Sequence, residues 1–204
     1  LISPDDHWNN KIKANYRAKD DFKVKEKDLK ALRSLGLTAV HAVPEKGIFK
    51  GKSDLVMIDN HFKSYKKDVA QIIEFKATGW SDRSYPNSLL GVIALIRQTL
   101  MDANWYHNST QIVEKYPDQN PLIPFHPSLS QLSDFQLNRR PFVFLTKEEH
   151  GAIRGLKIAD EFNLNPWILG SGYEYRRLNH IAELNPFFIF PLDFPAKPKV
   201  KDPH

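Results

Sequence analysis

The sequence contains no cysteine among its 204 residues. Disulfide bonds, thiolate metal ligands and cysteine nucleophiles are therefore excluded. It also contains no run of 18 apolar residues, so it predicts no membrane-spanning helix. Glycine is scarcer than proline, with 9 residues against 14, which indicates stiff loop junctions and few mobile linkers.

Motifs for common chemistries are also missing. Eight histidines are present, but their spacing gives neither H-x-H nor H-E-x-x-H, and no trio of them forms a recognisable metal site. Gly51-Lys52-Ser53 is only the tail of a Walker motif, because position 46 is lysine instead of glycine. We predict that residues 45–53 form a turn before a strand. Gly170-Ser171-Gly172 differs from the G-x-S-x-G nucleophile motif. We therefore assign no catalytic residue and no metal ligand.

The net charge of +5 raises the question of nucleic acid. Residues 1–35 hold nine basic and six acidic side chains (9 − 6 = +3), and the two signs alternate along the segment. Interleaved charges are typical of a solvated surface and differ from the grouped basic residues of a phosphate-binding track. We expect no nucleic-acid partner.

The segment 140–195 has the clearest pattern in the chain. It contains three short apolar runs, at 141–145, 166–169 and 186–190, of the kind found in strands buried on both faces. Segments 149–163 and 173–184, between these runs, carry helical apolar stripes. Two successive βαβ crossovers place three parallel strands side by side, with their carboxyl ends on one edge. Ligands bind at that edge in such sheets. His150 and His180 fall on the two predicted helices, and we expect them to be remote from the edge.

Polar residues that follow these strands are therefore the candidate binding residues. They are Thr146 after the first strand, Ser171, Gly172, Tyr173 and Glu174 after the second, and Asp193 after the third. Glycines at a strand-to-helix turn permit positive φ, and free amides at a helix start attract an anion. A purely structural turn, with Glu174 interacting with the helix dipole, is the alternative interpretation.

The remaining patterns complete a single-domain prediction for residues 1–204, with 196–204 as an exit linker or tail. We predict helices at 26–35, 89–106, 110–116 and 128–137, and a buried strand at 37–43 that joins the parallel sheet. Segments 54–59 and 69–75 are predicted to form an inserted antiparallel β-hairpin. The fold class is α/β, a partial TIM-barrel-like (β/α) parallel sheet with that hairpin inserted. Four barrel strands are predicted, where closure needs eight.

Several stretches resemble the imidazolonepropionase-like branch of the amidohydrolase superfamily, including its secreted members. They are LRSLGLTAV at 32–40, the loop from Pro44 to GIFKG at 47–51, LIRQTLMDANWY at 95–106, and the later strands of 140–195 with GSGYEYRR and PLDFP. The resemblance covers most of residues 28–195.

This resemblance implies a (β/α)₈ barrel that hydrolyses C–N bonds of amides or cyclic amides with a divalent metal, zinc in an intact active member. The family's ligands are an H-x-H on the first strand, a histidine on each of two middle strands, and an aspartate on the last. Here H-x-H is absent, and the middle positions fall at Thr146 and near Gly170. Asp193 follows a strand that looks like one of the family's earlier barrel strands and not like its last one. The resemblance also suggests a periplasmic or secreted protein, although no signal peptide is present.

We therefore expect a fragment or degenerate unit of an amidohydrolase-like hydrolase that is inactive as this chain. The alternative is a non-catalytic small-molecule-binding or scaffolding module. Half a barrel leaves strand edges unpaired, so we expect these edges to pair with another copy or with the remainder of a longer chain, or to be covered by residues 54–76.

Overall fold

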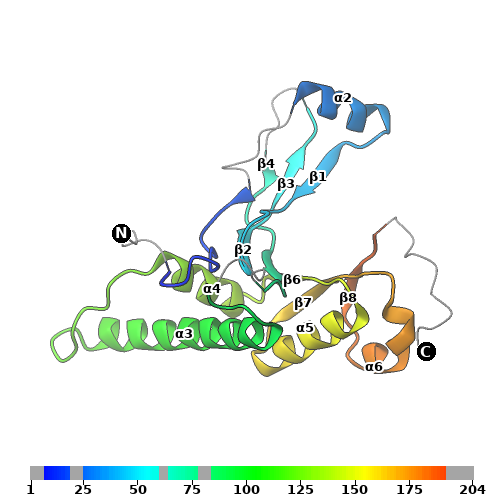
Figure 1. The fold of residues 1–204 in the computed structure, drawn as a ribbon. Helices are drawn as coiled ribbons and strands as arrows, with labels where there is room; N and C mark the ends of the chain where they lie inside the picture. The colour runs from blue at the N-terminus through cyan, green and yellow to red at the C-terminus, as the bar shows by residue number, and fades with distance from the viewer. Residues whose placement is uncertain (1–6, 19–24, 60–63, 78–83, 192–204) are drawn as a thin grey trace.

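The computed structural model describes residues 7–18, 25–59, 64–77 and 84–191 (Figure 1). Its body is a five-stranded sheet in the order β2-β5-β6-β7-β8. The strands are β2 (Phe49–Lys52), β5 (Gln71–Glu74), β6 (Pro141–Leu145), β7 (Asn165–Leu169) and β8 (Phe187–Ile189). The strands β5 to β8 run parallel, and β2 pairs antiparallel with β5. The predicted mixed α/β fold with a partial parallel sheet is confirmed.

Three helices and one face of this sheet form the main hydrophobic core. They are α3 (Leu89–Lys115), α4 (Pro127–Leu137) and α5 (Glu149–Glu161). Phe142 and Phe144 of β6 are fully buried in this core. Helix α5 lies so close to β6 that a Cβ on Gly155 would be 2.9 Å from the Phe144 ring. A glycine is therefore needed where α5 crosses this strand.

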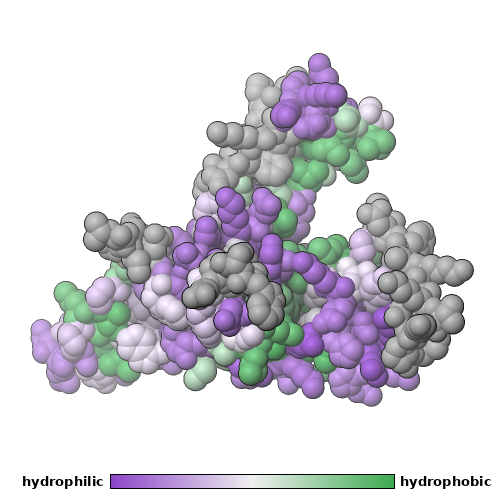
Figure 2. All heavy atoms as spheres, viewed as in Figure 1, coloured by the Kyte–Doolittle hydropathy of each residue, from purple (hydrophilic) through white to green (hydrophobic). Residues whose placement is uncertain are grey.

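A second, three-stranded sheet projects from the body as an arm (Figure 1). It contains β1 (Ala39–Ala42), β3 (Asp54–Met57) and β4 (Ser64–Lys66) in the order β1-β3-β4, all antiparallel. Helix α2 (Glu26–Ser34) precedes β1 and lies at the tip of the arm. Figure 2 shows hydrophobic surface beside the end of α2, where Leu35 and Leu37 are exposed.

The structure corrects two strand assignments. The segment 37–43 was predicted to be a buried strand of the parallel sheet, but β1 belongs to the arm and His41 and Val43 are exposed. The predicted hairpin between 54–59 and 69–75 is also wrong in its pairing. Strand β3 pairs with β1 and β4, whereas β5 enters the parallel sheet next to β6. β5, and not 37–43, is thus the first parallel strand.

Three further predictions change in detail. The helices predicted at 89–106 and 110–116 are one continuous helix, α3, which runs from Leu89 to Lys115. The Thr110 hydroxyl donates to the Tyr106 carbonyl within it. The helix predicted at 173–184 is a 3₁₀ turn, η1 (Glu174–Arg177), followed by α6 (Leu178–Glu183). The segment 49–52, predicted as part of a turn, is strand β2. No helix within the described segments has the length and apolar character needed to cross a bilayer.

Candidate functional site

The carboxyl ends of the parallel strands lie along one edge of the sheet. Glu74 is the last residue of β5, Thr146 follows β6, and Gly170 follows β7. The registers pair Glu74 with Leu145, and Leu145 with Leu169, so the three strand ends are neighbours. This is the edge at which α/β sheets bind ligands.

Thr146 is at this edge, but its hydroxyl is already engaged. Its Oγ1 donates a hydrogen bond to the Leu169 carbonyl at 2.8 Å, and its amide donates to the same oxygen at 3.2 Å. The side chain therefore ties the end of β6 to the end of β7.

The turn after β7 is organised around the carboxylate of Glu174. This side chain is buried and accepts hydrogen bonds from the amides of Ser171 at 2.6 Å and Gly172 at 2.9 Å, and from the Ser171 hydroxyl at 3.0 Å. Gly172 has φ of +86°, and the Tyr173 amide donates to Ser171 Oγ. The turn amides that were predicted to attract an anion thus bind the carboxylate of Glu174 in the same chain. Asp193, the remaining candidate, lies outside the described residues.

The most concentrated charge at the edge is a cluster that sequence reasoning missed. The carboxylate of Glu74 lies 2.7 Å from Lys50 Nζ and 3.5 Å from Lys147 Nζ. The side chains of Lys50 and Glu74 are 6% and 12% exposed, whereas Lys147 is 78% exposed. Lys50 also donates to the Glu45 carbonyl. We call Lys50, Glu74 and Lys147 the edge ion cluster.

The cations of this cluster keep the Glu74 carboxyl ionised. Burial raises the pKa of Glu74, but the hydrogen bond and charge of Lys50, with the charges of Lys147 and Lys76, outweigh burial and lower it below its ordinary value. The cluster went unpredicted because 69–75 was assigned to a hairpin. The sequence did contain a signal for this cluster, because Glu74 follows a short apolar run. A polar residue in that position is expected where a strand of a parallel sheet ends.

The edge residues do not fit the metal that the family resemblance implies. An H-x-H motif on β5 would place its two imidazoles on one face of the strand, two residues apart. Ile72 and Glu74 occupy such a pair of positions. Ile72 cannot bind a metal, and the Glu74 carboxylate is already paired with two ammonium groups. Thr146 and Gly170 supply no imidazole. No set of three or more histidine, aspartate or glutamate side chains able to hold a metal occurs in the segments described.

His150 is closer to this edge than its helical position suggested. It occupies the first turn of α5, which begins where β6 ends, and its Nδ1 is 3.6 Å from Glu149 Oε1. The sequence interpretation that placed it remote from the edge is corrected. Helices that follow parallel strands begin at the carboxyl edge.

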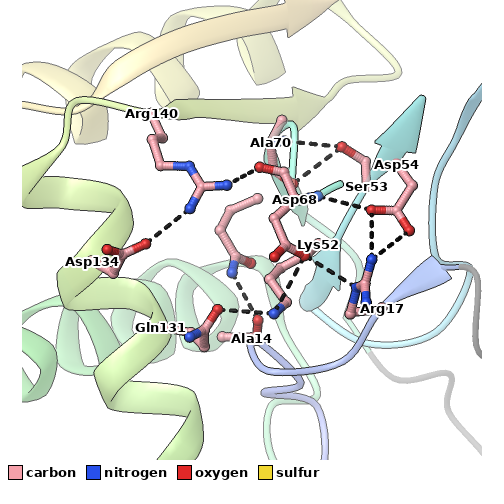
Figure 3. Close-up of polar contacts among 11 residues, drawn as sticks. Ala14, Arg17, Lys52, Ser53, Asp54, Asp68, Ala70, Gln131, Asp134 and Arg140 are labelled. Carbon is pink, nitrogen blue, oxygen red and sulfur yellow. Dashed lines mark hydrogen bonds and ion pairs between the residues drawn. The ribbon is translucent and has the colours of Figure 1, made fainter. Parts of the chain in front are cut away.

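A second polar network lies at the opposite, amino edge of the sheet, where the arm joins the body (Figure 3). The Arg17 guanidinium contacts the fully buried Asp54 at 3.1 Å and Asp68 at 3.2 Å. Lys52 reaches Asp68 at 3.4 Å and donates to Gln131 of α4 at 2.9 Å. These contacts connect the segment before the arm, both sheets and a core helix, so the network fixes the arm on the body.

A cavity of about 450 Å³ lies close to the edge ion cluster. It is lined by Lys13, Tyr16, Ala18, Val43, Pro44, Glu45 and Lys46. Glu45 links the two features, because its carbonyl accepts from Lys50. The lining combines an aromatic ring with two lysines and one glutamate, so basic residues exceed acidic ones by one.

Comparisons with known proteins support the fold. The sequence matches no protein-family profile and no curated protein. A similar solved structure is that of an amidohydrolase from Thermotoga maritima MSB8, with a TM-score of 0.77 and 18% sequence identity. The similarity covers 94% of this chain and 52% of that one, so the chain spans about half the length of the amidohydrolase. The chain therefore has an amidohydrolase-like fold over that length.

Proposed function

We propose that this chain is one part of an amidohydrolase-like hydrolase unit and does not hydrolyse C–N bonds by itself. The observation that carries the proposal is the edge ion cluster. At the strand end where a metal-dependent amidohydrolase places ligands, Glu74 is neutralised by the buried ammonium of Lys50. The unit as a whole would act on amides or cyclic amides, with zinc held by residues outside this chain.

Two further features support this assignment. The solved amidohydrolase that shares the fold is about twice as long as this chain. The parallel sheet has four parallel strands in the described segments, and a closed barrel of this type has eight. If the catalytic face is assembled from the ends of all eight barrel strands, these four strands supply only part of it.

The test combines metal analysis with turnover on the purified chain. After incubation with excess Zn²⁺ and desalting, we expect well below one zinc ion per chain. We also expect no hydrolysis of a simple amide, a lactam or a dipeptide above the rate of a denatured sample. Stoichiometric zinc together with turnover would overturn the proposal.

The second candidate is a non-catalytic module that binds a small anion. The cavity favours it, because Lys13 and Lys46 bring two positive charges, against one acidic residue, Glu45, to a site with one aromatic wall. Such a site would recognise a carboxylate or phosphate through ammonium groups. The residues Ser171 to Glu174 contribute less to this candidate, since their amides are satisfied internally.

Thermal unfolding with citrate and with inorganic phosphate tests this candidate. Binding predicts a rise in Tm with ligand concentration that is reduced in Lys46→Ala and unchanged in the control variant Lys157→Ala on α5. Equal shifts in all three proteins, or no shift, would contradict specific binding at the cavity.

A further inference from the structure

A second cavity, of about 460 Å³, lies between α3, the end of α4 and the end of α5. That volume falls within the range of about 300–1,000 Å³ that is usual for small-molecule sites. Part of its lining comes from the loops that lead into β6 and β7. Those loops are at the amino ends of the strands, so this cavity and the edge ion cluster are at opposite edges of the sheet.

Four of the side chains that line this cavity are carboxamides. They belong to Asn104 and Asn108 of α3, Gln136 of α4, and Asn163 after α5. Gln136 Oε1 is buried and accepts no hydrogen bond within the described segments. The exposed side chains of Asn104 and Asn108 have no hydrogen-bond partner in the same part of the chain. The cavity therefore presents donors and acceptors that the described fold does not use.

The elements around the cavity are bonded to one another. Arg139 Nη1 donates to Asn163 Oδ1 at 2.9 Å, and Asn165 Nδ2 donates to the Arg139 carbonyl at 3.0 Å, so the loops before β6 and β7 are joined. Helices α3 and α4 are joined as well, because the Ser133 hydroxyl donates to the Ala103 carbonyl at 2.7 Å. The guanidinium and the carboxamides are thus carried by a connected frame, and such preorganisation lowers the cost of binding.

The lining favours a neutral ligand whose groups both donate and accept hydrogen bonds. A carboxamide offers an accepting oxygen and a donating NH₂, and a hydroxyl group complements both. An anion only accepts, so it would leave the Gln136 oxygen unpaired. Among the described lining residues, Arg139 alone is an arginine or lysine, and the Phe162 ring adds an apolar surface. A ring with hydroxyl groups on its rim and C–H groups on its faces matches this combination.

We propose that this cavity binds a pyranose sugar. The sugar hydroxyls accept from Arg139 and exchange hydrogen bonds with the carboxamides of Asn104 and Gln136, and a C–H face of the ring packs on Phe162. Gln136 reaches the sugar by rotation about χ3, a broad torsion that turns either amide atom toward the cavity. The inference does not depend on the proposed function, because this site shares no residue with the edge ion cluster or with the cavity at Glu45.

Saturation-transfer-difference NMR on the purified chain tests the site. The probes are glucose, galactose and mannose, each as the free sugar and as its methyl glycoside, and we expect saturation transfer to at least one of them. Gln136→Met and Asn104→Leu each remove one hydrogen-bonding carboxamide, so the Kd from a sugar titration should rise about fivefold in either variant. Gln111→Met is the matched control, since Gln111 is exposed on α3 and does not line the cavity.

The outcomes separate a sugar site from the alternatives. Weaker binding in both cavity variants but not in Gln111→Met supports the proposal, with far-UV circular dichroism confirming that each variant is folded. Binding of the methyl glycoside in preference to the free sugar also supports it and identifies the end of a glycan as the ligand. Absence of transfer to every sugar overturns the proposal, as does binding that Gln136→Met and Asn104→Leu leave unchanged. Displacement of the sugar by inorganic phosphate overturns it too, because that result identifies an anion site.

Discussion

At the scale of single residues, the interaction that defines the site is the ion pair of Lys50 and Glu74. Both side chains are almost fully buried, and their charged atoms are 2.7 Å apart. A buried ion pair adds little net stability compared with an apolar pair, but removing one partner leaves a desolvated charge. Replacing either Lys50 or Glu74 alone should therefore destabilise the fold.

Replacement of Lys50 tests this constraint. We expect Lys50→Met to lower the free energy of unfolding by about 3 kcal/mol, because Glu74 would lose its buried partner and keep only the exposed ion pair with Lys147 and the charge of Lys76. Urea denaturation measures the change. Lys50→Met combined with Glu74→Gln should recover part of the loss, since the unpaired charge is gone.

The exposed pair of Arg97 and Glu161 is the control for that measurement. Its atoms are also 2.7 Å apart, but the side chains are 46% and 42% exposed. Arg97→Met should cost less than about 1 kcal/mol, because water screens the pair. Similar losses for Lys50→Met and Arg97→Met would contradict a buried, energetically coupled cluster at the edge.

The low pKa of Glu74 also predicts a pH dependence. A carboxyl whose folded pKa lies below its unfolded value stabilises the fold above the unfolded pKa, and this stabilisation is lost as pH falls through the folded pKa. We expect the unchanged chain to lose stability relative to Glu74→Gln as pH falls below 4.5. Unfolding free energies at a series of pH values give this difference. A difference that is independent of pH would refute the linkage.

At the scale of elements, apolar patterns predicted the βαβαβ block well but not the first half of the chain. The runs at 141–145, 166–169 and 186–190 became β6, β7 and β8. The prediction that all three are buried on both faces is wrong, because β7 is mostly half-buried and Phe187 of β8 is 57% exposed. The segments 37–43 and 69–75 are equally apolar. Only tertiary pairing placed the first in the arm and the second in the parallel sheet.

The glycines at 47 and 51 show why the loop before β3 was misassigned. Gly51 has φ of +117°, and a Cβ there would lie 2.5 Å from the Tyr16 carbonyl oxygen. The glycine is needed because the segment 11–17 passes directly over β2. That contact joins residues that are distant in sequence, so no local pattern reveals it. The glycines by themselves therefore predicted a turn instead of a strand.

The turn after β7 gives a prediction at this scale. Glu174→Ala removes the acceptor for the half-buried Ser171 and Gly172 amides, and each lost hydrogen bond to a charged group costs about 1.5–3 kcal/mol. We expect faster hydrogen exchange across 170–174 and a lower Tm. Glu183→Ala, whose side chain is 75% exposed, is the control. Unchanged exchange at 170–174 would show that the carboxylate does not hold the turn.

At the scale of the whole molecule, the sequence predicted a partial barrel from its strand count. It did not predict the arm, which depends on antiparallel pairings between segments without hairpin signals. Nor did it predict that residues 11–17 cover the outer edge of β2 through isolated parallel bridges. The predicted candidate residues Thr146 and Glu174 do lie at the carboxyl edge. Their engagement within the protein follows from contacts to Leu169 and to the turn amides, which no local pattern reveals.

Whether this chain of amidohydrolase-like fold binds a hydrolytic metal by itself decides the proposed function. The most direct measurement is zinc content, by elemental analysis of the purified, Zn²⁺-incubated chain, alongside amide turnover in the same sample. We expect well below one zinc ion per chain and no turnover, as the proposed function requires. One zinc ion per chain with hydrolysis of an amide or lactam would contradict it.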